Sequence, residues 1–190
     1  MEIFLASSLN NEAIELERAG NYVGAEAKHL EALRLKIIGS GEHSIHVAFT
    51  RNGLGELYLK MGKLDDAQEQ LEKAVAVREA AITDCGRDII EGDNFDTACS
   101  RDNMGRMFEM RGDFEKSVAW RTKGAPNHMI CSYFDCPGSM SCQFSRRTDL
   151  QACARCKAAF YCGKDCQRQD WKARHKVYCK ASGVATPAAG

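Results

Sequence analysis

The amino-acid sequence predicts a mainly α-helical protein, in which an antiparallel helix-pair solenoid is followed by a small cysteine-rich module. Three observations lead to this fold class. Residues 1–124 contain no proline and are rich in the strong helix formers Ala, Leu, Glu, Lys and Arg. A step centred on glycine recurs between stretches with helical apolar periodicity. Eight of the ten cysteines lie at or after Cys131.

The length and composition are those of a folded chain. Its 190 residues allow one ordinary domain or two small ones, and 44% hydrophobic with 27% charged residues is typical of a globular protein. No apolar run approaches the roughly 18 residues of a membrane span, and residues 1–11 lack the basic start and long apolar core of a secretory signal. We therefore expect no membrane partner and a cytoplasmic and/or nuclear protein.

The charge is distributed unevenly along the chain. Residues 1–127 hold 16 Lys and Arg against 22 Asp and Glu, a formal charge of −6, whereas residues 128–190 hold 10 against 4, a formal charge of +6. Cysteine follows the same division. The sequence therefore predicts two parts of different kinds, an acidic helical part and a basic cysteine-rich part.

The recurring step occurs three times, in AGNY, MGKL and RGDF, centred on Gly20, Gly62 and Gly112. The glycines are 42 and then 50 positions apart, and the extra eight residues fit a polar loop over 85–94. Glycine tolerates the left-handed conformation that ends many helices, so each step predicts a turn between two helices. Three helix pairs over residues 1–125 follow.

Small and large residues keep a common register around these turns. The second copy has this order: Leu54, Gly55, Tyr58, then Ala67, Leu71 and Ala74. Residues 52–79 thereby resemble a tetratricopeptide repeat (TPR), and the long period resembles the kinesin-light-chain type. The third copy departs from the pattern, because Arg121 and Gly124 stand where a large apolar and a small residue are usual. The alternative is a six-helix bundle without a repeat.

The resemblance implies that the helix pairs bind extended peptides or helices on a concave face. Polar residues on the first helix of each pair are candidates for that face, although a solvated helix surface is the alternative: Arg51, Asn52, Arg101, Asn103 and Arg106. His43 and His46 are expected to be surface or capping residues, because no third ligand type lies near them.

The cysteine-rich part contains four pairs of metal-ligand residues. They are Cys131 with Cys136, Cys153 with Cys156, Cys162 with Cys166, and His175 with Cys179. A Cys-x-x-Cys turn presents two thiolates to one ion, and a spacing of four places His175 and Cys179 on one face of a helix predicted over 165–180. Eight ligands suffice for two tetrahedral zinc sites. Cys85, Cys99 and Cys142 are left over.

Structural zinc explains the cysteines better than the alternatives. A unit of 49 residues, 131–179, with few aliphatic side chains needs a staple. Disulfides would require an oxidising compartment, and a thiol-redox pair would require a βαβ context that is absent from the pattern. A catalytic zinc keeps an open position, whereas eight ligands fill two sites. We therefore expect two structural Zn²⁺ ions.

The segment CARCKAAFYCGKDCQRQDWKARHKVYC resembles a MYND-type zinc finger. The resemblance predicts a finger over residues 128–180 and an interleaved ligand set: Cys131, Cys136, Cys162 and Cys166 on one zinc, and Cys153, Cys156, His175 and Cys179 on the other. The first pair has four intervening residues rather than the usual two, so Cys142 competes with Cys131 or Cys136 as a ligand.

MYND fingers bind short proline-rich peptides, so the resemblance implies a zinc-binding adaptor that recognises peptide segments of partner proteins. A shallow groove beside Gln167 and Trp171 is the implied peptide site, and packing against the zinc core is the alternative role of Trp171. The sequence contains no nucleophile–His–acid arrangement or phosphate loop, so no enzyme activity is expected. It indicates no oligomeric state.

A nucleic-acid-associated regulatory zinc finger is the alternative function. It would use the basic residues of the second part: Arg146, Arg147, Arg155, Lys157, Lys164, Arg168, Lys172, Arg174, Lys176 and Lys180. Two such zinc sites would carry −2 and −1, which lowers the formal charge of this part to +3. The scattered arrangement also lacks the pattern of a recognition helix, so nucleic-acid binding is not favoured.

The two parts are joined by a short linker. Residues 124–127 (GAPN) give little reach, so we expect the finger to pack near the last helix pair. The sequence after it, 181–190, is small and polar and predicts a flexible tail.

Overall fold

A computed structural model describes residues 2–84 and 95–180. The chain forms two compact units that divide between Asn103 and Met104. Residues 104–124 of the third predicted helix pair therefore share a unit with the cysteine-rich segment. The domain boundaries predicted from the sequence, at 125 and 128, stay a prediction, and the predicted loop over 85–94 and the tail over 181–190 lie outside the described residues.

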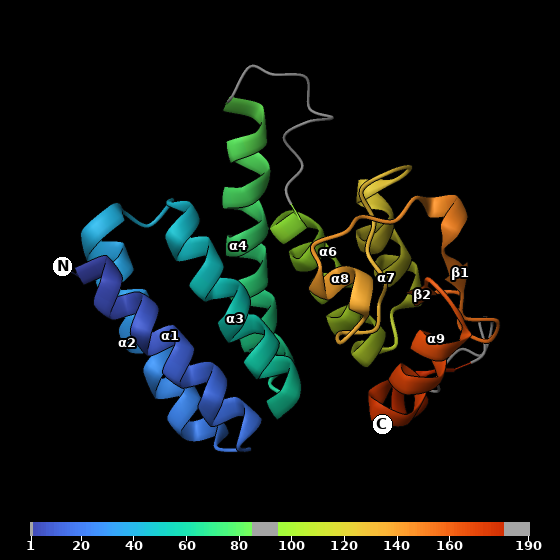
Figure 1. The fold of residues 1–190 in the computed structure, drawn as a ribbon, viewed down its shortest axis with the longest axis horizontal. Coiled ribbons are helices and arrows are strands. Elements are labelled where there is room, and N and C mark those ends of the chain that lie inside the picture. The colour runs from blue at the N-terminus through green and yellow to red at the C-terminus, as the bar shows by residue number, and fades with distance from the viewer. Residues whose placement is uncertain (1, 85–94, 181–190) are drawn as a thin grey trace, which may run out of the picture. The chain divides into compact units, whose positions relative to one another are not determined.

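The first unit is built of antiparallel helix pairs, as the sequence predicts. Helices α1 (Glu2–Arg18) and α2 (Tyr22–Ser40) form one pair, and α3 (Ile45–Met61) and α4 (Leu64–Asp84) form the next (Figure 1). The N-terminal part of α6 (Phe95–Arg111) follows. None of the described helices is long and apolar enough to cross a membrane.

The turns of the helix pairs are the glycine steps. Gly20, Gly62 and Gly112 have φ of +76°, +74° and +80°, a conformation that L side chains rarely adopt. On the far side of two of these turns, the side chains of Asn21 and Asp113 accept hydrogen bonds from the backbone N–H groups of Gly24 and Lys116. Each glycine thus ends one helix and the next polar residue begins its partner.

Small residues let the paired helices approach closely. Ala13 of α1 and Ala25 of α2 are fully buried against Leu57, and Gly55 of α3 lies against Leu71 of α4. The close contact follows the predicted register, in which a small residue on one helix faces a large one on its partner.

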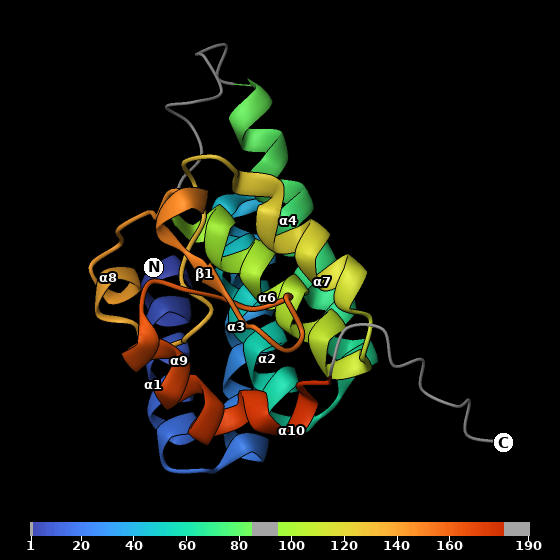
Figure 2. The ribbon, with the colours of Figure 1, turned by 90° about the vertical axis from the view of Figure 1, so that its right-hand side faces the viewer.

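The second unit combines the end of α6 and α7 (Phe114–Arg121) with short elements. These elements are η1 (Thr122–Gly124), α8 (Pro137–Met140), η2 (Arg147–Asp149), β1 (Gln151–Ala152), β2 (Phe160–Tyr161), α9 (Lys164–Asp170), η3 (Trp171–His175) and α10 (Lys176–Tyr178). Figure 2 shows α7 beside α6. Strands β1 and β2 are antiparallel, with Gln151 opposite Tyr161 and Ala152 opposite Phe160.

The helix predicted over 165–180 forms with a change of pitch. α9 passes into a π-helical turn, η3, before α10 ends at Tyr178. π-Helical turns are rare and occur often at functional sites. This one ends at the candidate ligand His175.

The core of the second unit joins α7 to the cysteine-rich segment. Phe114 and Val118 of α7 pack against the cluster of buried cysteines, together with Tyr133 and Trp171. Val118 also packs against the buried residues Met129, Leu150 and Phe160. The expectation that the cysteine-rich segment packs near the last helix pair is confirmed for residues from 104 onward.

Candidate metal centre

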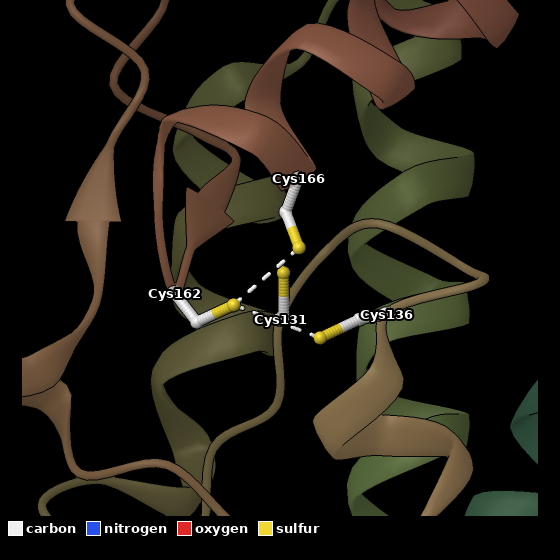
Figure 3. Close-up of side chains that lie close together, drawn as sticks. All are labelled: Cys131, Cys136, Cys162 and Cys166. Atoms are coloured by element: carbon white, nitrogen blue, oxygen red, sulfur yellow. Dashed lines mark hydrogen bonds between the residues drawn. The ribbon is translucent and has the colours of Figure 1, made fainter.

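The first group of candidate ligands comes from three places in the chain. Cys131 and Cys136 precede α8, Cys162 follows β2, and Cys166 lies in α9. Their sulfur atoms all lie within 4.8 Å of one another. The Cys136 and Cys162 sulfurs are 3.6 Å apart and those of Cys162 and Cys166 are 3.4 Å apart, as the dashed lines in Figure 3 mark.

The second group is buried throughout. Cys153 and Cys156 lie in the turn between β1 and β2, His175 ends η3, and Cys179 follows α10. The four ligand atoms lie within 4.8 Å of one another. The Cys153 and Cys179 sulfurs are 3.8 Å apart, and Nε2 of His175 is 3.6 Å from the Cys156 sulfur.

Both groups fit tetrahedral zinc. Bond lengths of about 2.3 Å to sulfur and 2.0–2.1 Å to nitrogen place two sulfurs about 3.8 Å apart, and a sulfur and a nitrogen about 3.6 Å apart. The sulfur–sulfur and sulfur–nitrogen distances given above are 3.4–3.8 Å. Thiolate and imidazole donors in fours are the usual ligands of structural zinc. Two structural Zn²⁺ ions therefore fit this segment, one with four thiolates and one with three thiolates and an imidazole.

Backbone hydrogen bonds shape the loops that carry the ligands. In the Cys-x-x-Cys turn, the N–H of Lys157 donates to the carbonyl of Cys153, and the N–H of Ala158 points at the Cys156 sulfur at 3.5 Å. The N–H of Cys179 donates to the carbonyl of His175, which keeps this pair one helical turn apart. The predicted spacing therefore acts through ordinary turn geometry.

The two groups interleave along the chain, as the resemblance implied. Ligands of the second group at 153 and 156 lie between those of the first group at 136 and 162. Cys142 belongs to neither group. It is exposed and has a φ of +53°. The ligand identities themselves stay a prediction until bound metal is measured.

The surroundings of the thiols differ between the two groups. Burial opposes ionisation of Cys153, but N–H groups of Cys156 and Arg155 and the ring of His175 together lower its pKa to about 7. In the first group, burial and the neighbouring Cys162 and Cys136 thiols raise the pKa of Cys166 to about 12. A cation shared by each group would offset this repulsion between thiolates.

Sequence reasoning missed Glu109, a buried carboxylate beside the second group. It lies near the end of α6 and its side chain is fully buried. Oε1 of Glu109 is 2.5 Å from Nδ1 of His175 and 3.0 Å from Nη1 of Arg174, and Oε2 is 2.9 Å from Nη1 of Arg121. Burial alone would raise its pKa, but Arg121, Arg174 and His175 lower it well below the usual range.

Arg121, the departure from the repeat pattern, has a partner on each side. Its aliphatic part lies against Gly105, where a Cβ atom would be 2.5 Å from Cγ of Arg121. Its guanidinium pairs with Glu109 and donates to the carbonyl of Ala158, two residues after Cys156, at 2.7 Å. Arg121 therefore keeps the helix contact of a repeat residue and adds a contact to the turn that carries two ligands.

The candidate peptide residues lie on one side of α9 and η3, one helical turn apart. Gln167 and Trp171 are both half-buried. Trp171 packs against the cysteine cluster and meets the His175 ring edge-on, with ring centroids 5.7 Å apart. Part of the Trp171 side chain thus packs against the cysteine cluster, which is the alternative role predicted for it from the sequence.

Most of the candidate concave-face residues form hydrogen bonds with other residues of the first unit. Arg51 is buried and donates to Glu42 and Gln70, and Asn52 and Asn103 are buried and hydrogen-bonded to Glu56. The alternative interpretation, a solvated helix surface, is wrong for Arg51, Asn52 and Asn103, because their side chains are buried. The sequence shows that they are polar but not that neighbouring helices supply their partners.

The remaining two candidates are half-buried. Arg101 pairs with Glu79 in the first unit, and Arg106 of the second unit lies over the ring of Phe134 with its guanidinium carbon 5.6 Å from the ring centroid. Both therefore have partners within their own unit rather than lying fully open to solvent.

Comparison with family models matches two parts of the chain. Residues 4–80 match the tetratricopeptide repeat model, and residues 139–179 match the MYND finger model. Among solved structures, the chain is similar to BtubC (BKLC) from P. vanneervenii, with a TM-score of 0.54 and 31% identity. That similarity covers 60% of this chain and 43% of BtubC.

Among curated proteins, the similarity falls on the finger region. N-lysine methyltransferase SMYD2 of Rattus norvegicus is 48% identical over 93 residues, covering 40% of this chain and 21% of that protein. SMYD2-A of Danio rerio is 46% identical over 44 residues, and SMYD2 of Homo sapiens is 50% identical over 36 residues. The chain thus matches only 21%, 10% and 8% of these relatives.

The repeat match, the finger match and the two ligand groups agree with one another. The first unit has the helix pairs of the repeat model, and the second has the donor sets of the finger. This chain therefore carries tetratricopeptide repeats followed by a MYND-type zinc finger.

Proposed function

We propose that this chain is a non-enzymatic adaptor that binds extended, proline-rich segments of partner proteins through its finger. Tetratricopeptide repeats and MYND fingers are protein-interaction modules, and the chain combines both. The observation that carries the proposal is the position of Trp171, half-buried against the zinc core with Gln167 one turn away. The core fixes the indole, so binding a peptide costs little side-chain entropy.

A proline-rich chain suits such a surface. It is already extended, so it loses little conformational freedom on binding, and its rings pack well on aromatic side chains. Gln167 offers an amide that can donate to and accept from a peptide backbone. The proposal places the protein in a reducing compartment, cytoplasmic and/or nuclear, because the zinc ligands must be reduced thiols.

The charge of the finger favours a peptide over a nucleic acid. Of its basic side chains, Arg146 pairs with Asp149 and Arg168 with Asp165. Arg174 pairs with both Asp170 and Glu109. These pairs, together with the negative charge of the two zinc sites, reduce the positive charge that this part of the chain offers to phosphates.

The test is a fluorescence titration of the zinc-loaded full chain with proline-rich peptides. In a Trp120→Phe background, Trp171 is the sole tryptophan and reports binding directly. We expect a dissociation constant below about 1 mM and a loss of at least about tenfold in Gln167→Ala. Trp120→Phe itself should bind as the native chain does, measured by calorimetry.

The result that overturns the proposal is equally direct. A folded chain with two zinc ions that binds no peptide of a proline-rich array better than about 1 mM has no such site. Retention on DNA or RNA that falls steeply with salt would support the nucleic-acid alternative instead.

A further inference from the structure

The strongest unassigned feature of the second unit is its buried charge cluster. Glu109 is fully buried. It contacts the Arg121 guanidinium of α7, and the Arg174 guanidinium and His175 ring of η3. A carboxylate removed from water destabilises the folded chain unless its partners compensate for the lost hydration. A buried cluster of charges is stable only where each charge has a paired or hydrogen-bonded partner.

The cluster replaces apolar residues of the repeat. Glu109 and Arg121 follow Leu59 and Leu71 by 50 positions, the spacing that separates Gly62 from Gly112. Leu59 and Leu71 are buried in the second helix pair, and Gly105 faces Arg121 as Gly55 faces Leu71. The third pair therefore keeps the repeat geometry but carries two opposite charges where the second pair carries two leucines.

Glu109 and Arg121, the two charged residues at the leucine positions, both contact the finger. Arg121 donates to the carbonyl of Ala158 beside the Cys-x-x-Cys turn, and Glu109 contacts Nδ1 of His175. Nε2 of the same ring faces the Cys156 sulfur. One nitrogen thus points to the thiolates and the other to the carboxylate, which is the arrangement of a metal-ligating histidine held by an outer carboxylate.

We propose that Glu109 is a positioning residue for the second zinc site, holding His175 with Nδ1 protonated and Nε2 directed at the metal. Arg121 and Arg174 fix the carboxylate in turn, so the last tetratricopeptide-type helix pair forms the outer part of this site. Such outer contacts orient the ligand and raise its basicity, and their loss commonly weakens metal binding 10- to 100-fold.

The test measures zinc release from the full chain to a coloured chelator, with alkylation of the freed thiols to identify the site. In Glu109→Leu, we expect the zinc of Cys153, Cys156 and Cys179 to be released about 10- to 100-fold faster. The zinc of Cys131, Cys136, Cys162 and Cys166 should be released at the native rate.

Two further variants separate positioning from packing. Glu109→Leu combined with Arg121→Leu restores the leucines of the second helix pair, so the helices stay packed while the second zinc remains weak. Asp149→Asn is the control, because this carboxylate lies in the same unit, pairs with Arg146 at the surface and belongs to neither ligand group. It should release both ions at nearly native rates.

A spectroscopic readout does not depend on any variant. In the zinc-loaded native chain, ¹⁵N chemical shifts of the His175 ring should show a proton on Nδ1 and metal on Nε2. A metal-bound Nδ1, or release rates in Glu109→Leu and Glu109→Gln equal to the native ones, would overturn the proposal. Equal acceleration of both ions in every variant, Asp149→Asn included, would also overturn it by showing a general loss of structure.

Discussion

The side chain of Leu71 fills the space that a Cβ atom on Gly55 would occupy, since such an atom would lie 2.5 Å from Cγ and Cδ2 of Leu71. We predict that Gly55→Ala destabilises the first unit by about 1–3 kcal/mol, because the added methyl forces α3 and α4 apart. Urea denaturation followed by circular dichroism measures the change.

The control is Gly39→Ala, at an exposed position of α2. There alanine should stabilise the helix by up to about 1 kcal/mol, because it loses less backbone entropy than glycine. Stabilisation of both variants would show that Leu71 yields and that the helices are not closely packed at Gly55.

The first unit should lose stability in acid through Glu17. This carboxylate is buried, with Oε1 3.1 Å from Nε2 of His29 and Oε2 2.6 Å from Nζ of Lys60. Burial alone would raise its pKa, but His29 and Lys60 lower it below its ordinary value. The stabilisation is therefore complete above the pKa of the unfolded chain and is lost as the pH falls through the lower folded-state pKa.

Glu17→Gln tests this dependence. At neutral pH the variant should be less stable by about 1–3 kcal/mol, because it loses the charge-assisted bond to the Lys60 ammonium. Its free energy of unfolding should change less than that of the native chain between about pH 7 and pH 3. Parallel curves for the two proteins would exclude Glu17 as a source of the acid sensitivity.

Native mass spectrometry of the full chain should show two zinc ions. Their removal by a chelator should unfold the finger, because structural zinc supplies about 10–16 kcal/mol of apparent binding free energy to such modules. Loss of near-ultraviolet circular dichroism would report the unfolding. A single ion, or an unchanged spectrum after removal, would contradict the assignment of two closed structural sites.

Thiol reactivity should separate Cys142 from Cys99. Cys142 is exposed and lies outside both ligand groups, so it should react with iodoacetamide at a rate near that of a free thiol. Burial and nearby carboxylates raise the pKa of Cys99 to about 12, so it should react far more slowly in the folded chain. Peptide mapping measures both, and protection of Cys142 in the zinc-loaded chain would make it a ligand.

The sequence could predict the features that depend on short spacings. The glycine turns, the facing of Gly55 and Leu71, and the ligand pairs all involve residues within one helix pair or one turn, where geometry is nearly fixed. The role of Glu109 depends instead on a contact with His175, 66 positions away. No local pattern indicates which helix covers the finger.

One signal for Glu109 was nevertheless present in the repeats. Aligning the third copy with the second places Glu109 at the position of Leu59 and Arg121 at that of Leu71. Two opposite charges at buried repeat positions point to a buried pair with a further partner, since a lone buried charge is costly. Arg121 by itself indicates only a degenerate repeat.

The contacts of Glu109 and Arg121 also determine where the chain could be divided without separating the candidate ligands from the side chains that contact them. A piece beginning at the linker, 124–127, keeps every candidate ligand but leaves behind both side chains that touch His175, Arg174 and Ala158. A piece beginning with α6 keeps them. The segment that must be transferred to keep these contacts is therefore longer than the cysteine pattern. Recombination at the linker would transfer the ligands without Glu109 and Arg121 of α6 and α7.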